Sequence, residues 1–243
     1  MSYADFRRRQ SEAIHPGFAS AADASANDRA DFMRLTYLHL GGAILAFAGL
    51  TALLVNSSFA PSMMAALAGS RFMWLIVLGA FMLVGAIAQR WATSGASVGM
   101  QYTGLGLYIL AEAIIFVPLV FIANLKAPGS VGTAAVLTAT VFGGLTVTAL
   151  VTKRDFSFLG RALTIAGFAA MGMIIVSILF GFTLGSFFSL AMVVVAAGYI
   201  LYQSSQIMYH YPVGSHVAAS LALFASVALL FWYILRLVMA ARD

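Results

Sequence analysis

Forty consecutive residues, from Leu163 to Tyr202, contain no charged side chain. As one α-helix this stretch would be about 60 Å long, which is twice the hydrocarbon thickness of a bilayer. The stretch therefore has to fold back on itself. We expect the turn at Gly181 and Gly185, in the segment FGFTLGS, because glycine adopts the dihedral angles of tight turns. The same spacing also matches a GxxxG face for helix packing.

The rest of the chain has the same apolar character. It is 62% apolar and only 9% charged, whereas soluble domains have about a quarter of their residues charged. A transmembrane helix needs about 20 apolar residues. The sequence therefore predicts an all-α integral membrane protein with seven transmembrane helices. They are expected at residues 36–55, 72–89, 100–123, 131–151, 162–181, 184–203 and 217–239.

The chain divides into a short aqueous part and a long membrane part. Residues 1–33 are predicted to be a mobile tail, because the segment SAADASANDRADF is small, polar and without apolar periodicity. Residues 34–243 are predicted to form the seven-helix transmembrane domain. The longest loop is expected at residues 56–71, which leaves no room for a soluble catalytic domain between the spans.

Lysine and arginine residues predict the orientation. Nine of them fall in the N-terminal segment and the loops on its side, against four on the opposite side. Under the positive-inside rule, the N-terminus is expected in the cytoplasm. The net charge of +5 does not indicate nucleic-acid binding, because the basic residues are scattered among loops and do not share one face. The lipid bilayer is the expected partner.

Glu112 is the one acidic residue of the chain that lies within a predicted span. A charged carboxylate near the bilayer centre costs about 2.5 to 3.5 kcal/mol, so such a side chain normally faces the bundle interior or a watery cavity. Gly104, Tyr108 and Glu112 are spaced by four residues, which places them on one helix face. Two interpretations remain open: a protonated glutamate that joins helices by a hydrogen bond, or a relay for protons or cations.

Three histidines lie near predicted span ends. His39 is expected to be an interfacial or helix-bonded histidine rather than a metal ligand, although a histidine also titrates near neutral pH. His210 and His216 flank the turn YPVGS, but no carboxylate is nearby in sequence, so a metal pair there is disfavoured. The sequence predicts no metal site.

Other polar residues lie close to span ends. The amides and hydroxyls of residues 203–206 offer oxygen ligands to a cation, or satisfy backbone groups at the end of a helix. Asp155, in TKRDFSFLG, is expected to cap the following helix. The chain has no cysteine, no HExxH and no GxSxG, so we expect neither an enzyme nor a cofactor.

Several segments, taken together and in order, resemble the bacterial branch of the Bax inhibitor 1 (transmembrane BAX inhibitor motif, YccA-like) family. They cover nearly all of residues 35–238. The segments are TYLHLGGAILAF, MQYTGLGLYILAEAIIFVPLVFIA, FGGLTVTALVTKRDFSFLG, SILFGFTLG, AAGYILYQSSQIMYHYP and HVAASLALFASVALLFWYILRL.

The resemblance implies a seven-helix fold in the bacterial inner membrane, with the C-terminal helix at the centre and six helices around it. It also implies a pH-sensitive calcium leak that two aspartates control, one on the sixth helix and one on the seventh. In this chain these positions fall on Gln203 and near Ser226, so both carboxylates are missing. Because glutamine and serine do not titrate, a pH response has to depend on Glu112 or His39.

Two functions follow from the resemblance and the residues. The first is a non-enzymatic inner-membrane protein that passes cations such as calcium slowly, or sets ion balance and modulates stress. The second is a regulatory protein that transports nothing and binds a membrane quality-control protease or other membrane partners. The missing aspartate pair favours the second, and the buried glutamate favours the first.

Overall fold

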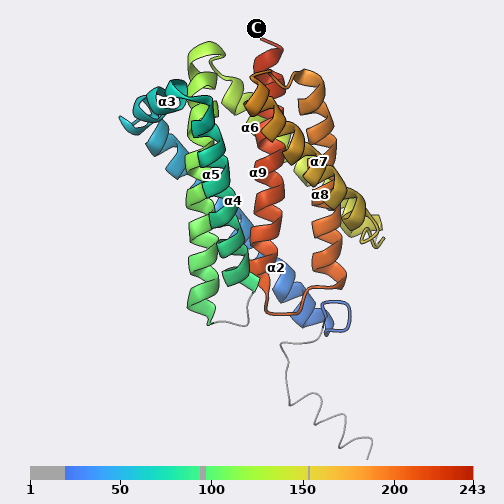
Figure 1. Ribbon diagram of the computed structural model, residues 1–243. Coiled ribbons are helices and arrows are strands. Elements are labelled where there is room, and N and C mark those ends of the chain that lie inside the picture. Colours follow the sequence, from blue (N-terminus) through green and yellow to red (C-terminus); the bar gives the residue numbers. More distant parts are fainter. Residues whose placement is uncertain (1–19, 94–96, 153, 243) are drawn as a thin grey trace, which may run out of the picture.

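The computed structural model describes residues 20–93, 97–152 and 154–242 (Figure 1). Within these ranges the chain forms eight α-helices. Their bounds are Ala26–Val55 (α2), Phe59–Gly69 (α3), Arg71–Thr93 (α4), Val98–Lys126 (α5), Ser130–Thr152 (α6), Leu159–Phe180 (α7), Ser186–Tyr209 (α8) and His216–Ala240 (α9).

Seven of the helices in the described ranges are long and apolar enough to cross a membrane. Each of the seven predicted spans matches one of them, which confirms the all-α membrane fold. Successive membrane-spanning helices run in opposite directions, so the loops lie at two opposite ends of the bundle. We call the end with residues 20–25 and the loop 210–215 the N-terminal end. The opposite end, with α3 and the C-terminus, is the C-terminal end (Figure 1).

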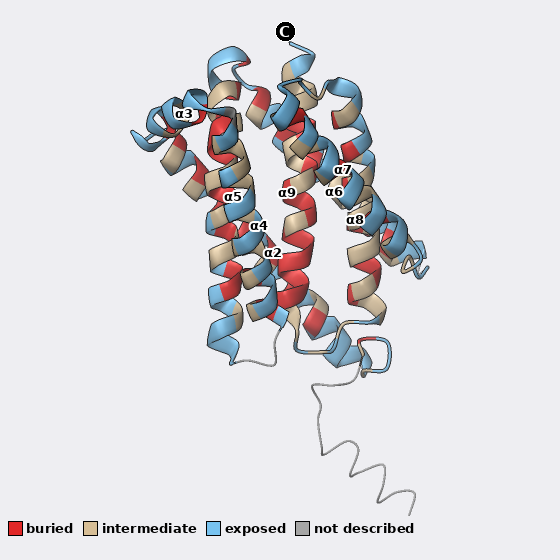
Figure 2. Ribbon diagram, viewed as in Figure 1, coloured by how far each residue is buried: buried red, intermediate tan, exposed pale blue. Residues whose placement is uncertain are grey.

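Helix α9 is the centre of the bundle, as expected. It packs against α2, α4, α5, α6 and α8. Eight consecutive residues, 217–224, are all buried, so more than two full turns are covered on every side. A helix that is apolar and buried all round belongs in the core of a bundle. Figure 2 shows this burial as an almost continuous red path along the lower half of α9.

The uncharged forty-residue stretch folds back at the predicted glycines. Helix α7 ends at Phe180, and Gly181 follows in the left-handed conformation with φ of 75°. Its N–H donates to the carbonyl of Ser177 at 2.9 Å, which closes the last turn. Gly185 immediately precedes α8. A residue with a Cβ atom is disfavoured at the left-handed position, so Gly181 is needed for the turn.

The first helix starts ten residues earlier than the sequence predicted. Ser25 is the N-cap of α2: its hydroxyl accepts from the N–H of Asp28 at 3.2 Å and donates to the Asp28 carboxylate at 2.7 Å. The bond to the Asp28 N–H satisfies a backbone donor that would otherwise lack a partner at the helix start. The helix can therefore begin in the polar segment that precedes the predicted span. Ala21 is also buried, and its N–H donates to the carbonyl of Tyr211 at 2.9 Å. Residues 20–33 are therefore part of the bundle, while residues 1–19 of the predicted tail lie outside the described residues.

The segment predicted as the longest loop contains a helix. Helix α3 has eleven residues, too few to cross a bilayer. It lies across the C-terminal end of the bundle and packs against α2, α4 and α5 (Figure 1). Ala60 and Leu67, seven residues apart and therefore on one face, are its buried side chains. This one-sided burial fits a helix that lies on the bundle rather than within it.

Helices α4 and α5 approach closely at Gly104. A Cβ atom at this position would lie 2.7 Å from the carbonyl oxygen of Ala88 and 3.2 Å from the backbone nitrogen of Ala92. Backbone atoms cannot yield as a flexible side chain can. Gly104 is thus required where it stands, on the same face of α5 as Tyr108 and Glu112.

We expect Gly104→Ala to destabilise the bundle. Overpacking a tight contact costs about 1 to 3 kcal/mol, and in a chain of this size each kcal/mol lowers Tm by about 2 to 4 °C. Gly106→Ala is the matched control, because nothing lies within 4 Å of a Cβ atom there. Thermal unfolding of both variants in detergent checks the expectation. Equal Tm values for the two variants would contradict the close approach.

Candidate functional sites

Glu112 lies in the interior of the bundle, with only 6% of its surface exposed. Its carboxyl group is hydrogen-bonded to the hydroxyl of Tyr108, one turn earlier on α5. The side chain therefore points into protein and not toward lipid, as the sequence predicted.

The Tyr108 ring connects Glu112 to the central helix. Its centroid lies 6.2 Å from that of Phe81 on α4 and 6.1 Å from that of Phe224 on α9. The Phe224 contact is edge-on, the arrangement that aromatic pairs prefer. Glu112, Tyr108 and Phe224 thus form a continuous chain of contacts from α5 to α9.

Phe224 also belongs to an aromatic cluster at the middle of the bundle, formed with Phe47 of α2 and Phe116 of α5. Phe47 lies 4.9 Å from Phe116 and 5.7 Å from Phe224 between ring centroids. Phe116 further contacts Phe231 and Trp232 of α9 at 5.7 and 4.9 Å. We call Phe47, Phe116 and Phe224 the aromatic cluster. Its rings fill the space where α2, α5 and α9 meet.

A cavity of about 410 Å³ lies on the other side of the aromatic cluster, toward the C-terminal end of the bundle. Residues of α2, α5, α6 and α9 line it, and both Phe47 and Phe224 contribute to its wall. Most of the lining is apolar. Its polar residues are Thr51, Asn56, Asn124 and Thr138. The hydroxyls of Thr51 and Thr138 are buried without a hydrogen-bond partner.

The two positions of the missing aspartates offer no substitute for a carboxylate. Ser226 is buried, and its hydroxyl donates to the carbonyl of Ala222 on its own helix at 2.9 Å. Gln203 is half-buried on α8. A neutral amide and a hydroxyl already engaged by its helix cannot act as a pair that titrates.

His39 and His216, far apart in sequence, lie side by side. Their ring centroids are 4.8 Å apart. Both rings contact the Tyr102 hydroxyl, at 2.7 Å from Nε2 of His39 and 3.5 Å from Nε2 of His216. His39 is also bonded within its helix, from Nδ1 to the carbonyl of Leu35 at 2.7 Å. The sequence missed this grouping because its members come from α2, α5 and α9.

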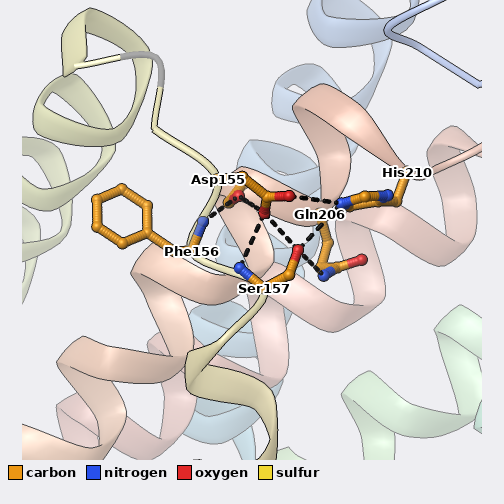
Figure 3. A network of polar contacts seen from close by, with 6 residues as sticks. Asp155, Phe156, Ser157, Gln206 and His210 are labelled. Atoms are coloured by element: carbon orange, nitrogen blue, oxygen red, sulfur yellow. Dashed lines mark hydrogen bonds and ion pairs between the residues drawn. The ribbon is translucent and has the colours of Figure 1, made fainter.

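His210 belongs to a different cluster, so the structure does not support a pair with His216. A polar network joins the loop between α6 and α7 to the end of α8 (Figure 3). Nε2 of His210 lies 3.2 Å from Oδ2 of Asp155 and 3.0 Å from Oγ of Ser157. Gln206 donates to Oγ of Ser157 at 3.1 Å, and Ser205 donates to Oδ1 of Asp155 at 3.2 Å. We call these five residues the loop network.

The predicted cap at Asp155 is replaced by this network. Helix α7 begins at Leu159, and its N-cap residue, Phe158, makes no side-chain capping bond. The Asp155 carboxylate instead accepts from the backbone N–H and the hydroxyl of Ser157. These two bonds, with smaller contributions from His210 and Ser205, lower its pKa from 3.8 to about 2. Asp155 therefore ties the loop to α8 as an ionised group.

The loop network contains serine, histidine and aspartate, but not in the geometry of a hydrolase. In a catalytic triad the serine and the aspartate contact opposite nitrogens of the imidazole. Here Ser157 and Asp155 both contact Nε2 of His210. The arrangement cannot pass a proton from the serine through the ring, so it fits a structural latch.

We expect Asp155→Asn to weaken this latch. The carboxylate side chain is half exposed, so its hydrogen bonds contribute about 1 kcal/mol or less. Because folding lowers the pKa, the stabilisation is complete above pH 4 or so and is lost as the pH falls toward about 2. Thermal unfolding of the wild type and Asp155→Asn, from pH 7 down to pH 2, measures the difference. Asp31→Asn, an exposed change on α2, is the control. A difference in Tm that does not shrink at low pH would contradict the assignment.

Six long apolar helices surround a seventh, buried one, and among the described residues Glu112 is the carboxylate inside the bundle. These features define a multi-pass α-helical membrane protein. The model of the family described as inhibitor of apoptosis-promoting Bax1 matches residues 29–243. The chain therefore belongs to the Bax inhibitor family, which confirms the resemblance seen in the sequence.

Its relatives include bacterial proteins without an assigned activity. The uncharacterized protein NMA0420 of Neisseria meningitidis serogroup A is 28% identical over 220 residues, covering 87% of this chain and 91% of that protein. The uncharacterized protein NMB2020 of serogroup B matches to the same extent. The uncharacterized protein PA2604 of Pseudomonas aeruginosa is 32% identical over 116 residues, which is 45% of this chain and 50% of that protein. These relatives place the chain among bacterial members of the family.

Proposed function

We propose that this protein is a non-enzymatic, slow pathway for cations, calcium among them, in the bacterial inner membrane. One observation carries the proposal: Phe224 lines the cavity on one side and contacts Tyr108, the partner of Glu112, on the other. Phe224 thus stands between the cavity and the Tyr108–Glu112 pair.

The chemistry of the route suits a hard cation. Calcium is bound by oxygen ligands from carboxylates, amides and hydroxyls. The cavity offers the amides of Asn56 and Asn124 and the hydroxyls of Thr51 and Thr138. Glu112 supplies the negative charge at the inner end. The aromatic rings between them offer no such ligands, so passage requires them to move, and a slow leak is the result.

The pH dependence of such a pathway has a different origin from the aspartate pair of the family. Gln203 and Ser226 do not titrate, so the proton would act on Glu112, which lies inside the bundle. In the orientation that the positive-inside rule favours, the N-terminal end faces the cytoplasm and the cavity faces the opposite side. The cavity would then receive cations from outside the cell.

The proposal is tested by calcium flux into liposomes that contain the purified protein and a calcium-sensitive dye. We expect flux above that of protein-free liposomes and of liposomes with an unrelated seven-helix protein at equal density. Background flux at every pH between 5 and 8 would remove the transport proposal.

The second candidate is a regulatory protein that binds a membrane quality-control protease or other membrane partners. Its support is the hydroxyl of Ser226, which is engaged within its own helix and leaves the family's gate position without a titrating group. Detergent pull-down with and without residues 1–19 tests it. This truncation leaves the packed residues 20–33 in place. Failure to recover a partner with either form would count against this function.

A further inference from the structure

Three side chains from three helices converge at the N-terminal end of the bundle. His39 comes from α2, Tyr102 is in the second turn of α5, and His216 is the first residue of α9. Nε2 of each histidine faces the same phenol oxygen, at 2.7 and 3.5 Å. Neither the aspartate positions of the family nor the route through Glu112 uses these residues.

The histidines are held in the orientation that metal-binding histidines have. A carbonyl oxygen only accepts, so Nδ1 of His39 must carry the hydrogen that it gives to the carbonyl of Leu35. Nε2 of His39 then keeps its lone pair. The His216 ring is likewise hydrogen-bonded to the backbone of Gly214. In metal sites, a bond of this kind at one ring nitrogen fixes the tautomer and aims the other nitrogen at the metal.

The distances from the Tyr102 oxygen to the two Nε2 atoms are close to two edges of a tetrahedral site. Zinc lies about 2.0 to 2.1 Å from its nitrogen and oxygen ligands, so the ligands of a tetrahedron are about 3.3 Å from one another. The two distances to the Tyr102 oxygen, 2.7 and 3.5 Å, lie on either side of this value. The first would have to lengthen by about 0.6 Å and the second to shorten by about 0.2 Å for both to reach it.

A fourth ligand has room to approach. A surface groove between α2 and α5 is lined by His39 and Tyr102, and its other lining residues are apolar or glycine. A water molecule entering there would complete a tetrahedral set. Within the part of the chain that the structure describes, no group of three His, Cys, Asp or Glu side chains could hold a metal. The proposed site therefore has two histidines from this set of donors and a tyrosine as its third ligand.

We propose that His39, Tyr102 and His216 bind a divalent transition metal of the zinc class, with Tyr102 as phenolate. The bound ion would join α2 and α5 to the first turn of the central helix. This site is independent of the cation route proposed above, since it lies at the opposite end of the bundle from the cavity and holds a softer ion.

The test is zinc binding to the purified full-length protein, prepared with a purification tag that contains no histidine. We expect one zinc ion per chain, by competition with a chromophoric chelator, and a higher Tm with zinc. Replacing a ligand should weaken binding by about tenfold or more in His39→Ala and His216→Ala. Tyr102→Phe keeps the ring and removes only the oxygen, so it serves if a histidine variant fails to fold.

His210 provides a matched control. His210→Ala should bind zinc as the wild type does, because His210 belongs to the loop network. The proposal is overturned if the wild type binds no zinc, or if the Tyr102→Phe and His216→Ala variants bind it as tightly as the wild type. The zinc-binding result does not depend on whether the protein passes calcium in the flux assay. Either proposal can therefore be contradicted while the other stands.

Discussion

Glu112→Gln is expected to reduce calcium flux to nearly the background of protein-free liposomes. The change keeps the size of the side chain and a hydrogen-bond acceptor for Tyr108, but it removes the one carboxylate that the described residues place inside the bundle. A charge without compensation at the bilayer centre costs about 2.5 to 3.5 kcal/mol. That cost corresponds to about a 10²-fold lower rate of passage. The measurement is dye-reported flux at equal protein density.

Two variants separate the charge from other effects. Glu112→Asp keeps a carboxylate and should retain flux well above Glu112→Gln. Glu12→Gln makes the same chemical change at the other glutamate of the chain, which precedes the first predicted span, and should behave as the wild type. If Glu112→Gln conducts as the wild type does, then the glutamate only joins helices, and the relay interpretation is wrong.

Phe224→Ala is expected to have the opposite effect on flux and a large effect on stability. Phe224 is 1% exposed and separates the cavity from Tyr108. Removing its ring would extend the cavity toward Glu112, so flux should rise several-fold. The same deletion should cost about 3 to 5 kcal/mol of folding free energy, as for other buried phenylalanines. Flux and thermal unfolding are measured on one preparation.

The control is Phe187→Ala, since Phe187 on α8 is 86% exposed and faces away from the bundle. It should change neither flux nor Tm appreciably. Phe224→Leu, which removes less volume, is the variant to use if Phe224→Ala does not fold. Unchanged flux in folded Phe224→Ala and Phe224→Leu would show that the aromatic cluster does not limit passage.

The parts of the fold that depend on local apolar runs could be predicted from the sequence. Each span is a continuous apolar segment, and the bilayer fixes its length. The number and length of these segments therefore predict seven helices. The turn at Gly181 follows because forty uncharged residues exceed one bilayer. The interior position of Glu112 follows from the cost of exposing a carboxylate to lipid. In each case one large constraint, the thickness of the bilayer or the free-energy cost of a charge in lipid, decides the outcome.

The remaining features depend on weaker local signals or on contacts between residues that are far apart in the sequence. Helix α3 was missed because its eleven residues fit no membrane span, although Pro61 in its first turn is compatible with a helix start. The early start of α2 had a local signal, Ser25 followed three residues later by Asp28, that the polar composition of the segment obscured. The bond of Asp155 to His210 joins residues 55 positions apart, and no local pattern announces such a contact.

The claim at the centre of this account is that the interior position of Glu112 can be reached from water past Phe224. Because the chain has no cysteine, a single Glu112→Cys change introduces a unique target for a small, positively charged thiol reagent. We predict slow modification of Glu112→Cys in liposomes and faster modification when Phe224→Ala is added. Ala113→Cys, at a fully buried neighbouring residue, should stay unmodified in both backgrounds. Equal rates at positions 112 and 113, with and without Phe224, would contradict the account.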